Sequence, residues 1–160
     1  MRLPLLIRLR RVGYRGAYVG LRIWWFVGRP HTHGVKLLVH DDHGRVLFVR
    51  HTYGDRSSWE LPGGGIRRRE APLAAARREA HEELGAELSA WRDLGSTEIS
   101  GLGKTTTLHC FEASAAGLTL IPDLGELKEL RWAPLTSPPA PLGEDAPAVL
   151  RLLVERVNGI

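Results

Sequence analysis

The chain has 160 residues, 43% hydrophobic and 25% charged, which predicts one ordinary soluble globular domain. Its single cysteine, Cys110, excludes an internal disulfide and fits a reducing cytoplasm; the apolar, strand-like run around it favours buried packing over a nucleophilic role. The formal charge of +4 is uneven, because residues 1–40 hold seven arginines, one lysine and no acidic residue (+8), whereas the remainder sums to −4.

Residues 1–30 are predicted to form a basic, aromatic helical arm before a single domain over residues 31–160. The apolar run that Arg8 interrupts has only five residues, too few to span a membrane. Trp24, Trp25 and Phe26 favour one or two short helices packed on the domain or across a homodimer interface, since burying three aromatic side chains contributes several kcal/mol at about 25 cal/mol per Å². Contact with acidic lipid or another polyanion is the less favoured alternative, because each basic residue contributes about 1 kcal/mol and salt screens it.

Two strands are predicted next, over residues 35–39 and 45–50, with a turn over residues 41–44. A loop over residues 51–58 then leads through Trp59 and Pro62 to the glycine run at residues 63–65. Such glycines allow the main chain to approach a metal ion or a phosphate closely.

A helix is predicted to begin at Pro72, whose fixed φ and missing N–H suit the first turn, and to end before Gly85. Ala71 offers no side-chain acceptor for an N-cap. At about 100° per residue, one face of this helix is an apolar stripe for the core. The stripe consists of Leu73, Ala76, Ala80 and Leu84.

Glu79, Glu82 and Glu83 fall together on the flank of that stripe. Like charges one turn apart cost a few tenths of a kcal/mol in an isolated helix, roughly 0.2–0.5 per pair. Crowded carboxylates beside a buried face are better explained by a hard cation, and oxygen ligands suit Mg²⁺ or Mn²⁺.

The remaining strands are predicted over residues 87–96, 105–114 and 127–133, followed by a proline-rich connector over residues 134–141 and a last helix that Asp145 caps. Residues 100–105 imitate the end of a phosphate-binding P-loop, but Glu98 stands where that motif needs glycine, and the threonines favour a strand. We therefore predict a flexible hairpin, with Lys104 as an outside candidate for a phosphate contact. No internal repeat or second domain is apparent.

The glycine run and the helix together resemble the signature of the Nudix hydrolases, G-x5-E-x7-R-E-U-x-E-E-x-G-U, where U is a bulky aliphatic residue. The fixed positions that match are Gly64, Glu70, Arg78, Glu79, Glu82, Glu83 and Gly85. Both U positions hold alanine, Ala80 and Ala86, which thins the local packing and leaves the chemistry untouched.

This resemblance implies an α+β fold, an α/β/α sandwich with a mixed β-sheet between helices. It also implies Mg²⁺-dependent hydrolysis of a pyrophosphate bond in a nucleoside diphosphate derivative or nucleoside triphosphate. By resemblance, the metal ligands are Glu79, Glu82, Glu83 and the main-chain carbonyl of Gly63. Arg78 would orient Glu79 or pair with a supporting Glu70.

The resemblance also implies further roles, and for these the sequence leaves more than one candidate residue. Glu126 is the first choice for one more carboxylate near the metal and Glu129 the second, and either Glu79 or Glu126 would be the base. The candidate substrate contacts are Arg50, His51, Tyr53 and Trp59, with Lys104 outside them.

The alternative function is that of a ligand sensor or protein-interaction module, which retains the cleft but does not catalyse a reaction. Nothing in the motif favours it, since a decayed site is expected to lose a carboxylate. The substrate subgroup is open. We expect a cytoplasmic protein with a nucleotide-type substrate, and the sequence indicates no clear nucleic-acid partner.

Overall fold

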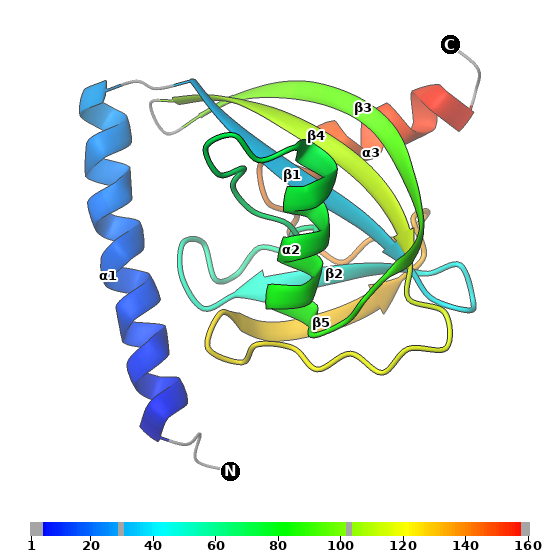
Figure 1. Ribbon diagram of the computed structural model, residues 1–160, viewed down its shortest axis with the longest axis horizontal. Helices are drawn as coiled ribbons and strands as arrows, with labels where there is room; N and C mark the ends of the chain where they lie inside the picture. Colours follow the sequence, from blue (N-terminus) through cyan, green and yellow to red (C-terminus); the bar gives the residue numbers. More distant parts are fainter. Residues whose placement is uncertain (1–4, 29–30, 102–103, 158–160) are drawn as a thin grey trace.

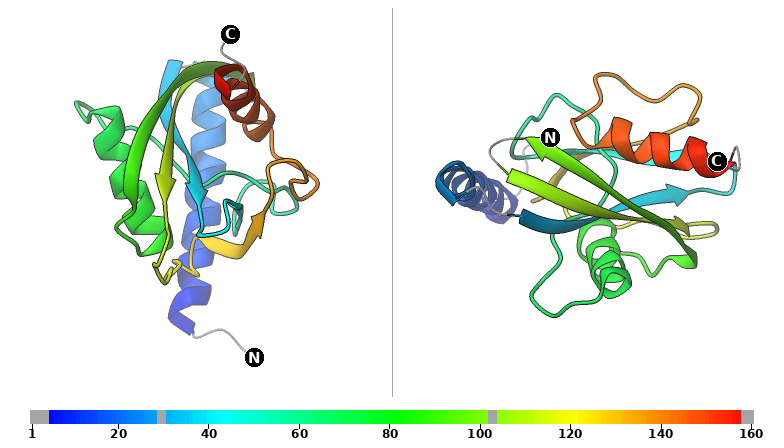
Figure 2. Two further views of the ribbon diagram at one scale, coloured as in Figure 1. Left: turned by 90° about the vertical axis from the view of Figure 1, so that its right-hand side faces the viewer. Right: turned by 90° about the horizontal axis from the view of Figure 1, so that it is seen from above.

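The computed structural model of the chain describes residues 5–28, 31–101 and 104–157, with side chains described for residues 5–21, 31–101 and 104–153. Its centre is a five-stranded mixed sheet that lies between two helices, α2 (Pro72–Leu84) and α3 (Ala146–Val157). Figure 1 and Figure 2 show these two helices on opposite faces of the sheet. The predicted α+β fold, an α/β/α sandwich, is confirmed.

The strands are β1 (His31–His40), β2 (Val46–His51), β3 (Ser89–Gly101), β4 (Lys104–Ser114) and β5 (Leu127–Ala133). Their order across the sheet is β3-β4-β1-β2-β5, and β1 and β4 run parallel while the other neighbours are antiparallel. Central β1 is buried on both faces from Gly34 to Val39, as expected of a strand covered by a helix on each side.

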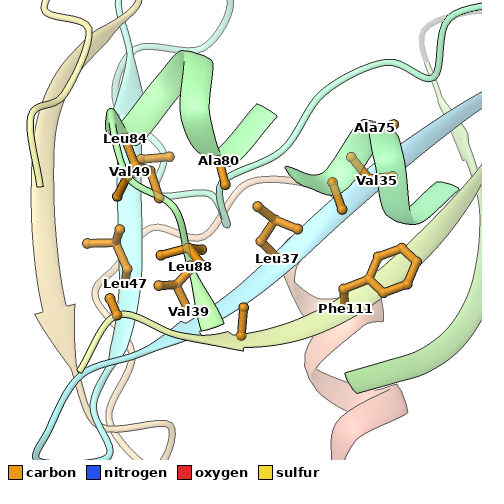
Figure 3. Close-up of a cluster of buried hydrophobic side chains, with 14 of the residues drawn as sticks. Val35, Leu37, Val39, Leu47, Val49, Ala75, Ala80, Leu84, Leu88 and Phe111 are labelled. Carbon is orange, nitrogen blue, oxygen red and sulfur yellow. The ribbon is translucent and has the colours of Figure 1, made fainter. Parts of the chain in front are cut away.

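Alternation along the strands divides the core into two layers. Val35, Leu37 and Val39 point toward α2 and pack with its Ala76 and Ala80, as the close-up in Figure 3 shows for most of this cluster. The second layer lies toward α3 and includes Leu38, Phe48, Trp59, Val149 and Leu153. The buried alanines at the two U positions of the motif pack in the first layer.

Helix α2 has the bounds that the sequence predicts. Ala71 precedes it in an extended conformation without a side-chain cap, and Gly85 ends it in the left-handed conformation, with φ of 61° and its N–H donated to His81 O. A Cβ at Gly85 would lie 2.4 Å from Ile121 O, so glycine is required there for space as well as for φ.

The N-terminal arm is a single helix, α1 (Leu5–Gly28), of 24 residues, which corrects the prediction of one or two short helices. It stands beside the sandwich (Figure 1) and contacts it through Arg10, which pairs with Asp123. The rings of Tyr14 and Tyr18 both contact Tyr53, the first stacked and the second tilted. The side chains of Trp24, Trp25 and Phe26, to which the packing prediction applied, lie outside the described residues. No helix in the described part of the chain has the length and apolar content to cross a membrane.

Two strands extend well beyond their predicted bounds, while β2 and β4 differ from theirs by one residue. β1 begins at His31, where its polar start pairs with β4: Thr32 Oγ1 lies 2.8 Å from Thr106 Oγ1, and His31 Nε2 lies 2.9 Å from Thr107 Oγ1. β3 continues to Gly101 rather than ending at Ser96. A strand, not a helix, begins at Lys104, so no P-loop forms, as predicted; residues 102 and 103 of the hairpin lie outside the described residues.

Candidate active site

The glycine run crosses the edge of β1 and is fixed to it by main-chain hydrogen bonds. Val35 N donates to Gly64 O at 2.9 Å, and Leu37 N donates to Pro62 O at 2.9 Å. Gly63 has φ of 141°, and a Cβ there would lie 2.1 Å from Val35 O, so only glycine fits this approach. The loop is therefore held rigidly over the second half of α2, where Glu79 and Glu83 lie.

Glu79 lies directly under this loop. A Cβ built on Gly64 would lie 2.5 Å from both Cδ and Oε1 of Glu79, so the absent side chain makes room for the carboxylate. Burial raises the pKa of Glu79 to about 7; Arg78 opposes the rise and the neighbouring charge of Glu83 adds to it. A cation placed here would reverse that rise by favouring the ionised form.

Glu83 is completely buried, with 0% of its surface exposed. Its Oε2 accepts a hydrogen bond from Gly63 N at 3.0 Å, and its Oε1 lies 3.2 Å from His51 Nε2. Burial opposes the charge on His51, but the hydrogen bond and the charge of Glu83 outweigh it and raise the pKa of His51. Gly63 thus contacts the Glu83 carboxylate through its amide, and the role of its carbonyl as a ligand stays a prediction.

Arg78 links the acidic residues of the motif. Its Nε and Nη2 donate to the two oxygens of Glu70 at 2.7 and 2.9 Å, its Nη1 donates to Glu79 Oε1 at 2.6 Å, and its Nη2 also donates to Gly65 O at 2.9 Å. The Arg78 guanidinium and the amide of Arg67 lower the pKa of Glu70 to about 2. Arg78 therefore makes both of the contacts that the sequence offered as alternatives.

Glu82 lies at the outer side of this group. Its side chain is 45% exposed, and its two oxygens accept hydrogen bonds from Arg67 and Arg78, each at 3.0 Å. The three glutamates of the helix are thus close in space, but only Glu79 and Glu83 are buried.

Glu126 reaches the same place from the segment before β5. Tyr53 Oη donates to Glu126 Oε1 at 2.8 Å, and Thr52 N donates to Glu126 O at 2.8 Å. Ligand atoms of His51, Glu83 and Glu126 all lie within 4.8 Å of one another, which is close enough to share one metal ion. Burial, with the charge of Glu83, raises the pKa of Glu126.

A cleft of about 1500 Å³ opens beside these carboxylates. Its lining includes His51, Tyr53 and Lys104 from the predicted substrate contacts, and Gly63, which contacts Glu83. Its wall also carries basic side chains, which suit phosphate: Arg67, Arg68, Arg69 and Arg151.

Arg50 and Trp59 are not among the residues that line this cleft. The Arg50 guanidinium lies 4.2 Å from the centre of the Trp59 ring, and its Nη1 lies 3.0 Å from Glu129 Oε2. Trp59 is only 2% exposed and packs in the core layer toward α3. The structure therefore places this pair, and Glu129, away from Glu79 and Glu83.

Lys36 and Glu60 are site residues that the sequence reasoning missed. Lys36 is 6% exposed, and its Nζ lies 3.2 Å from Glu60 Oε2 and 3.5 Å from Asp145 Oδ2. Burial lowers the pKa of Lys36, but Glu60 and Asp145 outweigh it, so the net shift is upward. Glu60 Oε2 also lies 4.0 Å from His51 Nδ1, which extends the charged cluster into the cleft. The sequence feature that could have identified Lys36 is a lysine inside the apolar run of β1, where a charge needs a partner.

The NUDIX domain model matches residues 30–153 of the chain. The chain belongs to the Nudix family. The resemblance drawn from the motif is thereby confirmed.

Known Nudix proteins match part of the chain. A CMP-5'-(N-acetyl-N-hydroxy-3-aminopropyl)phosphonate hydrolase from Streptomyces rubellomurinus is 35% identical over 102 residues, covering 62% of this chain and 50% of the relative. An RNA pyrophosphohydrolase from Halorhodospira halophila is 38% identical over 71 residues, covering 44% of this chain and 34% of the relative. The chain thus spans half or less of the length of these curated relatives.

A solved MutT Nudix hydrolase from Burkholderia pseudomallei superposes with a TM-score of 0.70 at 23% identity, covering 78% of this chain and 98% of that chain. At that identity the likeness shows the fold. The mixed sheet with a helix on each face is therefore the Nudix fold.

Proposed function

We propose that the chain hydrolyses a pyrophosphate bond in a nucleoside diphosphate derivative or a nucleoside triphosphate, with Mg²⁺ or Mn²⁺ as cofactor. The observation that carries this proposal is the buried pair Glu79 and Glu83 under the glycine loop, beside a cleft lined by basic side chains. Two carboxylates taken out of water need positive partners. Arg78 supplies one to Glu79, whereas Glu83 has the imidazole of His51, which is charged only when protonated.

The residues present fit a hard divalent cation. The donors are carboxylate oxygens, the type that Mg²⁺ and Mn²⁺ prefer. Burial, with a smaller contribution from the charge of Glu83, raises the pKa of Glu79, and a bound cation would offset both effects. Glu79, Glu82 and Glu83 would hold the ion. His51 and Glu126 lie close enough to Glu83 to offer further ligand atoms. When bound, such an ion neutralises phosphate charge and lowers the pKa of a bound water.

The chain's own residues supply position and a base. Arg78 holds Glu79 on one side and Glu70 on the other, which fixes the angle of α2 side chains toward the loop. Burial raises the pKa of both Glu79 and Glu126, and a raised pKa makes a carboxylate a stronger base. Tyr53 holds Glu126 by the hydrogen bond from its hydroxyl.

The substrate class rests on the cleft and on the relatives. Arginines at three consecutive positions, Arg67 to Arg69, line the cleft together with Lys104, and basic side chains of this kind bind phosphate oxygens. The names of the two relatives, a CMP-linked phosphonate hydrolase and an RNA pyrophosphohydrolase, both describe phosphorus compounds linked to a nucleotide. A nucleotide with at least one phosphoric anhydride is the shared chemistry.

The test is a panel of nucleotide sugars, dinucleotides and nucleoside triphosphates, assayed for release of phosphate or nucleoside monophosphate with Mg²⁺ or with EDTA. Glu83→Gln is compared with Glu87→Gln, a matched control at an exposed glutamate just after α2. We expect metal-dependent cleavage of at least one compound by the wild type and by Glu87→Gln, and its loss in folded Glu83→Gln. Cleavage that persists in Glu83→Gln, or none by the wild type, contradicts the proposal.

A further inference from the structure

Helix α1 presents two different faces along its length. One face meets the sandwich through Arg10, Tyr14 and Tyr18. The other face carries residues at alternating intervals of four and three, the spacing that aligns side chains along one side of a helix. This second face, here called the outer face, consists of Leu5, Leu9, Val12, Gly16 and Val19.

The outer face is apolar and uncovered. Its four large side chains are 57% to 70% exposed, and Leu6 beside them is 71% exposed. A Cβ built on Gly13, Gly16 or Gly20 would meet nothing within 4 Å. Figure 1 and Figure 2 agree that the sandwich lies on one side of α1 only. A continuous exposed apolar stripe of this kind marks an interaction surface.

Arginines border the outer face. Arg8, Arg11 and Arg15 lie on one flank of α1, again at intervals of three and four residues. Arg11 Nε and Arg15 Nε donate to main-chain carbonyls, Leu124 O at 3.0 Å and Thr52 O at 3.1 Å, and these contacts do not neutralise their charge. Arg8 is exposed, and residues 1–40 contain no acidic residue. The flank is therefore positively charged along the middle of the apolar stripe, from residue 8 to residue 15.

We propose that the outer face of α1 binds an anionic lipid surface, with the helix lying in the plane of the membrane and the sandwich on the aqueous side. An amphipathic helix with an apolar face and an arginine-rich flank is the element that binds membrane surfaces in this orientation. The apolar stripe enters the boundary of the acyl chains, and the arginines meet the lipid phosphates.

Charge decides between lipid and a second copy of the chain as the occupant. An antiparallel pair of α1 helices along the stripe would bring two arginine flanks together, and a parallel pair would oppose each arginine flank to one without a carboxylate, because residues 1–40 contain no aspartate or glutamate. An anionic surface turns the same charges into attraction. In the described part of α1, arginines and tyrosines contact the sandwich and the side chains of the outer face are exposed, while the packing of Trp24, Trp25 and Phe26 stays a prediction.

The test measures co-sedimentation of the full chain with phosphatidylcholine vesicles and with vesicles that contain phosphatidylglycerol. We expect the wild type to sediment with the anionic vesicles only, and less as salt rises, since screening weakens such attraction. The paired substitution Leu9→Glu with Val12→Glu is expected to lower the bound fraction at least about tenfold. Leu118→Glu, at a leucine 44% exposed between β4 and β5, is the matched control and should bind as the wild type does.

Circular dichroism and thermal melting establish that each variant is folded. If the glutamates disturb the helix, the paired substitution Leu9→Gln with Val12→Gln is tested in their place. The proposal is overturned if the wild type fails to bind anionic vesicles. It is also overturned if the folded variant with both outer-face substitutions binds them as well as the wild type does. Conversion of a dimer to a monomer by the outer-face substitutions, without vesicle binding by the wild type, assigns the face to a second copy instead.

Discussion

Replacing Gly64 with alanine tests the arrangement of the loop over the helix more sharply than removing a carboxylate. Neither Gly64 nor its neighbour Gly65 has a left-handed backbone, so both accept alanine without strain in φ. The new Cβ at position 64 would lie 2.5 Å from the Glu79 carboxylate, whereas one at position 65 would meet nothing within 4 Å. The two substitutions are thus chemically identical and differ only in what they touch.

The magnitude follows from this geometry. Ordinary contacts between such atoms are about 3.5 Å, so either the carboxylate or the loop has to move by about 1 Å. The loop is held by hydrogen bonds from Val35 N and Leu37 N, each at 2.9 Å, whereas Glu79 is the end of a rotatable side chain. Glu79 therefore moves, and a displacement of about 1 Å at a catalytic group costs roughly a hundredfold in rate.

The assay compares turnover and Mg²⁺ requirement for the wild type, Gly64→Ala and Gly65→Ala on whichever nucleotide the panel identifies. We expect Gly64→Ala to lose about a hundredfold in turnover, with a higher Mg²⁺ requirement, while its melting temperature stays near the wild-type value. Gly65→Ala should match the wild type in all three. Folded Gly64→Ala with wild-type turnover refutes the placement of Glu79 as a functional carboxylate under the loop.

Three further predictions follow from the same contacts. Glu82→Gln and Glu83→Gln should each lower turnover at least about a hundredfold without loss of the fold, measured by initial rates and circular dichroism, and wild-type rates in either reject that residue as a ligand. Glu70→Gln should lower turnover about tenfold or less. The pKa of Glu70 in the folded protein is lowered to about 2, so its ionised form stabilises the fold fully above the ordinary pKa of glutamate, and this stabilisation disappears as pH falls toward 2. The melting temperatures of wild type and variant should therefore converge in acid. Tyr53→Phe removes a hydrogen bond that favours ionised Glu126, so the pKa of Glu126 rises, and the acidic limb of the pH–rate profile should shift to higher pH if Glu126 is the base; an unmoved limb assigns the base elsewhere.

The parts of the fold that local chemistry specifies could be predicted from the sequence. Pro72 and Gly85 determine the ends of α2 because each has a backbone requirement of its own, and both ends agree with the structure. The start of β1 could not be found in this way. His31 and Thr32 are polar, and they join the sheet by pairing with threonines of β4 that lie more than seventy positions away.

The candidate site likewise contains residues whose proximity the sequence predicts and residues that only the fold brings together. Glu79, Glu83 and Arg78 lie on one helix, so their proximity follows from helical spacing alone. Lys36 and Glu60 join the site only because β1 and the segment before the glycine run become neighbours in the folded chain, and no spacing in the sequence announces that contact.

Helix α1 shows a third kind of limit. Its helical content could be predicted, but the choice of docking face depends on the partner surface. Asp123 and Tyr53 of the sandwich attract Arg10 and the helix tyrosines, and this leaves the leucines and valines outside. Hydrophobic reasoning about the arm alone favours the opposite arrangement.

The central claim is that Glu79 and Glu83 hold a divalent cation beneath the glycine loop. An anomalous-scattering map from crystals of the full chain soaked in Mn²⁺ tests it most directly. The account predicts a peak within coordination distance, about 2.0–2.3 Å, of oxygens from both carboxylates. A peak confined to exposed acidic residues, with Glu79 and Glu83 still holding only Arg78, His51 and Gly63, would contradict it.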